Sequence, residues 1–232
     1  MTNTRPFLLA FLLLLGAAGA HAADDAQDVE WLSYRDAYRQ MIRFEKFGKP
    51  KHLIQNHLQV SPKDKGGALD GVRLALSGPA TQLNLPLDAA GRAVFPFLKS
   101  AYDDNARLVL NRKAGQFVLQ PRVSIVPRAD GAYEIAELRS ACEQALDYLR
   151  YAGKPVQDRK CAGVRFAFAR TGVEPVVKLR GASAALPVED GSAFPDAAAG
   201  AFRIVTYRFA EGTDKGTLLT QGIPAAIAPE FR

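Results

Sequence analysis

The sequence is poor in the residues that usually carry redox, metal and aromatic-binding chemistry. Its 232 residues include two cysteines, three histidines and one tryptophan. The cysteines, Cys142 and Cys161, are too far apart for the Cys-x-x-Cys motif of a thiol oxidoreductase. The tryptophan, Trp31, falls on the apolar face of a predicted helix. The sequence therefore does not indicate an exposed aromatic platform for carbohydrate.

Metal and nucleophile motifs are also lacking. His52 and His57 are five residues apart, so they lie on opposite sides of a strand or about 140° apart on a helix and do not share a zinc ion locally. Ser183 lies in a Gly-Ala-Ser-Ala-Ala stretch without the second glycine of a nucleophile elbow. We expect no motif-borne catalytic residue, no metal and no cofactor. A pair of distant carboxylates that converge in the fold stays open.

Long hydrophobic runs are lacking after the N-terminus. There, Arg5 precedes an apolar run over 7–15, and small residues at positions 20 and 22 fit a cut after Ala22. The run is shorter than the ~20 residues of a bilayer-spanning helix, and no cysteine lies near the cut to carry a lipid. We therefore expect residues 1–22 to be a cleaved signal peptide and the mature chain to be a soluble periplasmic protein without a transmembrane span.

The two cysteines are expected to pair, because an even number of cysteines in an exported chain indicates a disulfide. Cys142 lies in a helical pattern, and Cys161 begins a strand pattern after a turn rich in Gly and Pro. Closing a loop of about twenty residues contributes ~3 kcal/mol of stability on the chain-entropy model. Two free thiols are the alternative.

The chain is basic, with a net charge of +6 that falls to about +5 when Arg5 leaves with the signal peptide. Such a balance influences association more than fold. It suits an envelope protein, an anionic glycan or a lipid surface as partner, and nucleic acid is not expected in that compartment. The best candidate binding residues are Arg165, Lys178 and Arg180, the last two on one strand face. The alternative is an ordinary charged outer face of a sandwich.

Hydrophobic spacing predicts a mainly β, α+β fold. Steps of three and four from Trp31 to Ile42 indicate an amphipathic helix that begins at the pair Ser33 and Asp36. From 52 to 126 the spacing changes to two, with turn signals between short runs, which predicts an antiparallel sandwich-like module. A second helix follows over about 135–149, and strand patterns then resume.

These patterns divide the chain into four parts. They are the signal peptide (1–22), an N-terminal helix with a β-sandwich-like module (23–130), a linking helix and turn (131–160) and a second β-rich module (161–232). The segment Leu85–Pro96 is similar to Leu186–Pro195, which suggests a duplication. Each segment should then join strands of its own sheet and bury its phenylalanine, Phe95 or Phe194. Chance similarity of two Ala-, Gly- and Pro-rich segments is the alternative.

Two resemblances are carried by these residues. The Asp88-x-x-Gly91-x-x-x-Phe95-Pro96 turn resembles the transthyretin-like and carboxypeptidase-regulatory β-sandwich modules over one hairpin. The segment Ser33–Tyr38, the turn at 85–88 and the later strands resemble a family of exported Gram-negative bacterial proteins with no assigned function. The resemblances imply a β-sandwich-like fold and an exported location, and they carry no catalytic residue to this chain.

Taken together, the sequence favours a non-catalytic periplasmic protein that binds a partner or supports the cell envelope. Two alternatives stay open. One is a small envelope hydrolase that uses carboxylates, and the other is a secreted inhibitor or interaction module. A concave surface with two carboxylates would favour the hydrolase, whereas a flat basic or aromatic patch would favour binding.

Overall fold

The computed structural model describes residues 29–64, 67–113, 115–170, 173–197, 202–212 and 215–232. The expected signal peptide, residues 1–22, lies outside the described residues. In chain order the elements are β1 (Val29–Ser33), α1 (Tyr34–Lys46), β2 (Ile54–Pro62), β3 (Leu74–Ser77), β4 (Gln82–Leu85), β5 (Arg92–Ala93), α2 (Lys99–Asp103), β6 (Arg107–Lys113), β7 (Phe117–Ile125), β8 (Ala132–Glu134), α3 (Ile135–Tyr151), β9 (Cys161–Ala169), β10 (Val176–Leu179), β11 (Glu189–Gly191), β12 (Phe202–Arg208), β13 (Thr217–Gln221) and β14 (Ala226–Phe231).

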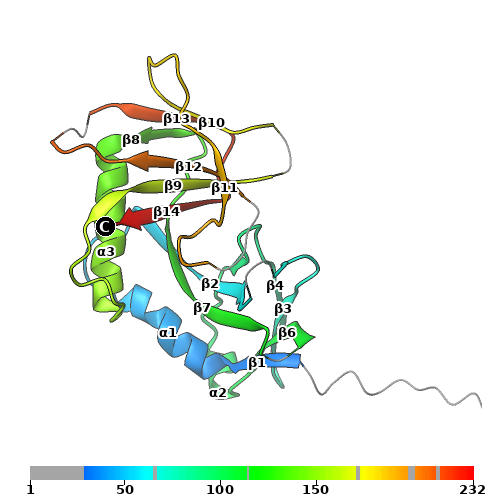
Figure 1. Ribbon diagram of the computed structural model, residues 1–232. Helices are drawn as coiled ribbons and strands as arrows, with labels where there is room; N and C mark the ends of the chain where they lie inside the picture. The colour runs from blue at the N-terminus through cyan, green and yellow to red at the C-terminus, as the bar shows by residue number, and fades with distance from the viewer. Residues whose placement is uncertain (1–28, 65–66, 114, 171–172, 198–201, 213–214) are drawn as a thin grey trace, which may run out of the picture.

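In the described part of the chain, the strands form three antiparallel sheets (Figure 1). A seven-stranded sheet has the order β11-β12-β9-β14-β7-β2-β5, a four-stranded sheet the order β1-β6-β3-β4, and a three-stranded sheet the order β10-β13-β8. The mainly β, α+β fold class predicted from the sequence is confirmed.

The seven-stranded sheet is built from both halves of the chain. Its C-terminal strand β14 lies between β9 and β7 and pairs with both. The segment Leu85–Pro96 begins in β4 of the four-stranded sheet and continues into β5, at one edge of the seven-stranded sheet. The segment Leu186–Pro195 contains β11, at the opposite edge of that same sheet. The prediction that each segment belongs to a sheet of its own is therefore wrong, although Phe95 and Phe194 are both buried as predicted.

The first helix begins at its predicted cap. The Ser33 hydroxyl accepts a hydrogen bond from the Asp36 backbone N–H at 3.4 Å, which satisfies one of the free donors of the first turn. Trp31, which the spacing placed on the helix face, lies instead in β1, where it pairs with Val109 of β6. The difference arises because a short strand that runs directly into a helix extends the apolar pattern without a turn signal between them.

Helices α1 and α3 pack on one face of the seven-stranded sheet, where the main core lies (Figure 1). Phe166 of β9 and Ile227 of β14 point to this face and contact apolar residues of α3. The opposite face carries a smaller cluster that includes Ala167, Ala226 and Phe194. Phe194 comes from the segment 192–197 after β11, so this segment covers the second face of the sheet.

The predicted disulfide joins α3 to the start of β9. Cys142 and Cys161 are linked with an S–S distance of 2.11 Å and a Cα–Cα distance of 6.0 Å. Both residues are buried, next to the partly buried Val156, Phe209 and Phe231. The bond ties the helix layer to the central sheet. None of the helices in the described residues is long and apolar enough to cross a membrane.

Candidate functional site

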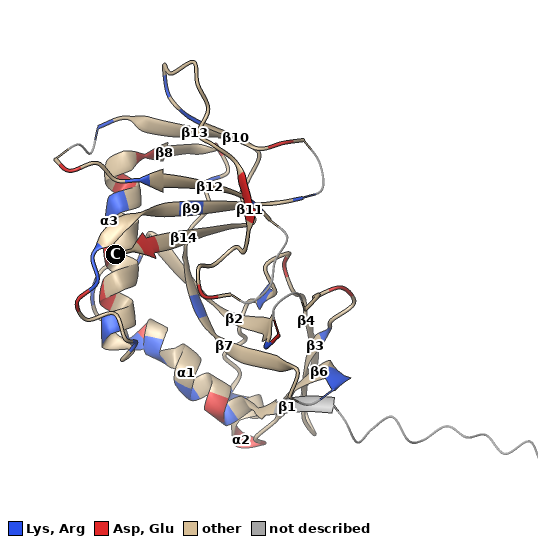
Figure 2. Cartoon of the chain, in the orientation of Figure 1, with Lys and Arg blue, Asp and Glu red and all other residues tan. Residues whose placement is uncertain are grey.

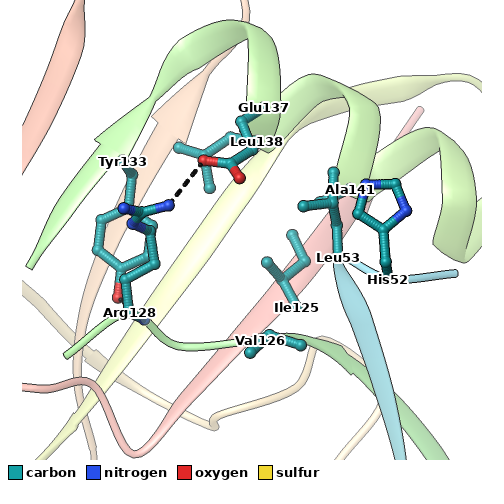
Figure 3. A pocket seen from close by; sticks show the side chains of 9 residues that line it. All are labelled: His52, Leu53, Ile125, Val126, Arg128, Tyr133, Glu137, Leu138 and Ala141. Atoms are coloured by element: carbon teal, nitrogen blue, oxygen red, sulfur yellow. Dashed lines mark hydrogen bonds and ion pairs between the residues drawn. The ribbon is translucent and has the colours of Figure 1, made fainter.

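A cavity of about 200 Å³ opens between the start of α3 and the connection from β7 to β8 (Figure 3). Its apolar walls come from β7, α3 and the turn before β2, and its polar residues come mainly from the β7–β8 connection and the first turn of α3. The lining residues are His52, Leu53, Ile125, Val126, Arg128, Tyr133, Glu137, Leu138 and Ala141. In Figure 3, Arg128, Tyr133 and Glu137 lie on one side of the cavity, and His52 and Ala141 on the other.

The β7–β8 connection is held in a defined conformation. Gly131 adopts a φ of +64°, and a Cβ there would lie 2.8 Å from the Thr220 carbonyl oxygen of β13, so this position favours glycine on both grounds. The Tyr133 hydroxyl accepts a hydrogen bond from the Arg128 backbone N–H at 3.0 Å. These contacts set Arg128 at the mouth of the cavity.

The opposite wall is fixed to α3 and β7 by the backbone of Leu53. Its N–H donates to the Gln144 side-chain oxygen at 3.0 Å, and its carbonyl accepts from the Val126 N–H at 3.0 Å. Both backbone groups are therefore satisfied beside an apolar cavity, where an unpaired group would cost free energy. The Leu53 side chain is left to line the cavity with those of α3.

Charges at the mouth form one small network. The Arg128 guanidinium donates to Asp130 at 2.9 Å and to Glu137 at 3.3 Å. The hydrogen bond from Arg128, followed by the one from the Ala132 N–H, lowers the pKa of Asp130 to about 2. Burial raises the pKa of Tyr133, so its phenol is neutral at pH 7. The network thus combines one cation with two carboxylates.

This arrangement suits binding better than acid–base catalysis. A carboxyl group that acts as general acid near neutral pH has a raised pKa, and the pKa of Asp130 is lowered instead. Glu137, the carboxylate that lines the cavity, is engaged by Arg128. The cavity has an apolar interior, and the Arg128–Glu137 ion pair lies at its entrance.

The three predicted binding residues do not lie together on one strand pair. Arg165 is on β9 of the seven-stranded sheet, where its guanidinium donates to Glu230 at 2.5 Å and to the Ser192 carbonyl at 3.3 Å. Lys178 lies on β10 of the three-stranded sheet and Arg180 directly follows it, and both are exposed. Because Glu230 compensates Arg165, the expected basic surface loses one of its three charges. Basic and acidic residues are also interspersed along α1 and α3 (Figure 2).

Sequence reasoning did not find the cavity. Its residues come from four separate segments, and their apolar members follow the ordinary core pattern of strands and helices. The one local signal is Arg128-Ala-Asp130-Gly131, where an acidic residue and a glycine form a turn that places an arginine beside the following helix. Among the described residues, no three His, Cys, Asp or Glu side chains gather as a possible metal site.

Comparison with known proteins adds no assignment. No protein-family model, curated protein or solved structure matches this chain.

Proposed function

We propose that this chain is an exported, non-catalytic binding protein of the cell envelope that holds a small, mostly apolar ligand in the cavity beside α3. The observation that carries the proposal is the cavity itself, whose walls are apolar side chains and whose mouth holds the Arg128–Glu137 ion pair. The exported location rests on the N-terminal pattern of residues 1–22 and on the resemblance to exported Gram-negative proteins.

The size of the cavity limits the ligand. Cavities for drug-sized molecules usually enclose about 300–1,000 Å³, and an apolar cavity of about 150 Å³ is enough for benzene. At about 200 Å³, this cavity matches one ring or one short branched chain. Such a ligand has few atoms, so an affinity on the order of 1 mM is expected for the isolated group.

The charge at the mouth selects the polar end of the ligand. Arg128 faces two carboxylates, Asp130 and Glu137, so the network has an excess of negative charge. A ligand with an amine can therefore approach Glu137 favourably, whereas a ligand with a carboxylate meets net repulsion. We infer an order of affinity in which an aromatic amine binds better than the matching alcohol, and the alcohol better than the acid.

The test uses benzylamine, benzyl alcohol and benzoate as probes in a methyl NMR titration of the full mature chain. Saturable shifts are expected at the Leu53 and Ala141 methyl groups, strongest with benzylamine. Ala141→Leu fills the cavity and should abolish the shifts at the Leu53 methyl groups. Glu137→Gln should weaken the binding of benzylamine and leave the binding of benzyl alcohol nearly unchanged. Tightest binding by benzoate, or equal shifts in the Ala141→Leu protein, would contradict the proposal.

The location is tested separately. Intact-mass analysis of the protein recovered from the periplasm of a Gram-negative host should give a chain that starts at Ala23. A full-length product confined to the cytoplasm would refute export and leave the cavity proposal untouched, since the NMR experiment does not depend on it.

A further inference from the structure

The face of the seven-stranded sheet that points away from α3 carries an unusual set of polar residues. In the β2–β7 pair, Gln55 faces Ser124, His57 faces Arg122 and Gln59 faces Gln120. Directly opposed residues of an antiparallel pair share a face, so these six side chains form one polar patch. Ser124 and Gln59 are buried even though they are polar. Both are hydrogen bonded: Gln59 contacts Arg122 and the Ala90 carbonyl, and the Ser124 hydroxyl accepts from Arg92 and Gln55.

Arg122 is the centre of this patch and is held in one orientation. Its Nε donates to the Gln59 side-chain oxygen at 2.7 Å, and the Gln59 amide in turn donates to the Ala90 carbonyl at 2.9 Å. The guanidinium carbon lies 4.7 Å from the centre of the Phe194 ring. With one edge and one face fixed, Arg122 has little conformational freedom left to lose when it binds an anion.

The remaining edge of Arg122 holds a carboxylate from the covering segment. Nη1 of Arg122 donates to both carboxylate oxygens of Asp196, at 2.6 and 2.9 Å. The Arg122 side chain is 12 % exposed, whereas that of Asp196 is 63 % exposed. The arginine is thus a built part of the sheet, and the carboxylate reaches it from the surface segment 192–197, which Phe194 anchors.

His57 adds a second polar group beside Arg122. The two residues are opposed in register, and the Nδ1 atom of His57 is buried without a hydrogen-bond partner among the described residues. Burial, followed by the charge of Arg92, lowers the pKa of His57, so the imidazole is neutral at pH 7. A neutral imidazole can donate one hydrogen bond and accept another. An unpartnered ring nitrogen on a residue directly opposite a fixed arginine suits a ligand with carboxylate and hydroxyl oxygens.

We propose that Arg122 and His57 form a binding site for the carboxylate group of a small molecule, and that Asp196 occupies this site in the free protein. An entering carboxylate replaces Asp196 on Nη1 of Arg122 and leaves the contacts of Arg122 with Gln59 and Phe194 in place. The carboxylate class follows from the group that the site already holds. This site is separate from the cavity beside α3 and does not depend on its ligand.

The test is chemical rescue by acetate in the Asp196→Ala protein. Thermal unfolding is followed while acetate replaces chloride at constant ionic strength. The Asp196→Ala protein should show a saturable rise in Tm with acetate, and its apparent affinity for acetate should be ~10-fold or more above that of the wild type. In the wild type, Asp196 occupies the site most of the time, and the apparent affinity falls in proportion to the fraction of molecules whose site is free. Inorganic phosphate should bind more weakly than acetate.

Two variants serve as controls. Asp190→Ala also removes an exposed carboxylate, from ion pairs with the exposed Arg170 and Arg203, and should show no acetate-specific response. The Arg122→Gln/Asp196→Ala double variant should lose the response. If that double variant does not fold, NMR of the Asp196→Ala protein replaces it. The Arg122 Nε–H resonance of that protein should shift when acetate is added. Equal responses in Asp190→Ala and Asp196→Ala, an unmoved Arg122 signal, or tighter binding of phosphate than acetate would overturn the proposal.

Discussion

Replacement of Asp88 by Asn should destabilise the protein more than its partly exposed position suggests. Among the described residues, the Asp88 carboxylate is the one acidic partner of Arg92, whose side chain is 4 % exposed while that of Asp88 is 39 % exposed. Arg92 donates to Asp88 Oδ2 from Nε at 2.8 Å, to the Ser124 hydroxyl at 2.9 Å and to the Ala225 carbonyl at 2.6 Å. These bonds connect the turn before β5 with β7 and with the start of β14, so one side chain joins both halves of the sheet.

The magnitude follows from what the substitution leaves behind. Asn keeps a side-chain oxygen for the backbone N–H groups of Ala90 and Arg92, which Asp88 Oδ1 accepts at 2.9 Å each, so the turn itself is preserved. What is lost is the countercharge of a buried guanidinium. Removing one partner of a fully buried ion pair costs about 3–5 kcal/mol, and water reaches Asp88, so we expect about 2–3 kcal/mol here.

Arg92→Met separates this charge effect from lost packing. It removes the buried charge together with its need for a partner, and the Asp88 carboxylate it leaves behind can be hydrated. We therefore expect Arg92→Met to cost no more than Asp88→Asn, although it deletes more hydrogen bonds. Because Asp88→Asn and Arg92→Met act on the same pair, the double variant should be less destabilised than the sum of the two.

Urea unfolding and calorimetry of the four proteins measure these differences, and about 2–3 kcal/mol corresponds to a fall in Tm of roughly 4–12 °C for a chain of this size. Asp103→Asn is the matched control, because Asp103 also pairs four residues away, with Lys99, but both side chains are exposed. It should change stability by less than about 0.5 kcal/mol. If Asp88→Asn proves as mild as Asp103→Asn, water compensates Arg92 and the reasoning fails.

Three further outcomes are expected. Reduction of Cys142–Cys161, which spans 19 residues, should lower stability by ~3 kcal/mol and Tm by roughly 6–12 °C, and mass spectrometry without reductant should find the linked peptide. Phe95→Ala should cost about 3–5 kcal/mol in urea unfolding, because the buried ring stacks on Tyr34 with centroids 5.2 Å apart. Carboxyl NMR should give Asp130 a pKa of about 2, compared with its ordinary value of 3.8. The contribution of the Asp130 carboxylate to stability is therefore present above pH 3.8 and lost as the pH falls toward 2. Arg128→Gln should raise the pKa of Asp130.

The sequence predicted the local elements well because their signals are local. The hydroxyl of Ser33 with the N–H of Asp36 begins α1, and the apolar steps from Ile135 to Ala145 match the buried face of α3. The Cys142–Cys161 pair was predictable because the chain has only these two cysteines, so only one pairing was possible. Each of these inferences depends on residues within a few turns of one another, or on a single pair.

The arrangement of the sheets was not predictable in the same way. β14, at the end of the chain, separates β7 from β9, which belong to different predicted modules (23–130 and 161–232). A pairing between strands about one hundred residues apart has no signature in the spacing of either strand. The similarity of Leu85–Pro96 and Leu186–Pro195 reflects two short edge strands next to buried phenylalanines, at opposite ends of one sheet.

The polar side of β2 shows why the Arg122 site escaped sequence reasoning. Ile54, Leu58 and Val60 alternate with polar residues, a pattern typical of a strand with one face in water. In the structure that polar face is covered, because the segment 192–197 arrives from a distant part of the chain and places Phe194 against Arg122. Alternation distinguishes the two faces of a strand, but it does not reveal whether the polar face meets solvent or a second layer of protein.

The two proposed sites differ in whether the free protein already places a charged partner in them. The cavity beside α3 lies where a turn, a strand end and a helix start meet, and the charged residues of its lining, Arg128 and Glu137, pair with each other. The Arg122 site buries a charge that requires a partner at all times, and Asp196 supplies it. A carboxylate ligand must displace Asp196 from Arg122. It therefore needs a contact in addition to the one that a simple carboxylate such as acetate makes with Arg122. His57 Nδ1 and Ser61 Oγ are both buried on that face without a hydrogen-bond partner among the described residues, and His57 is the one directly opposite Arg122. We propose that His57 provides the difference.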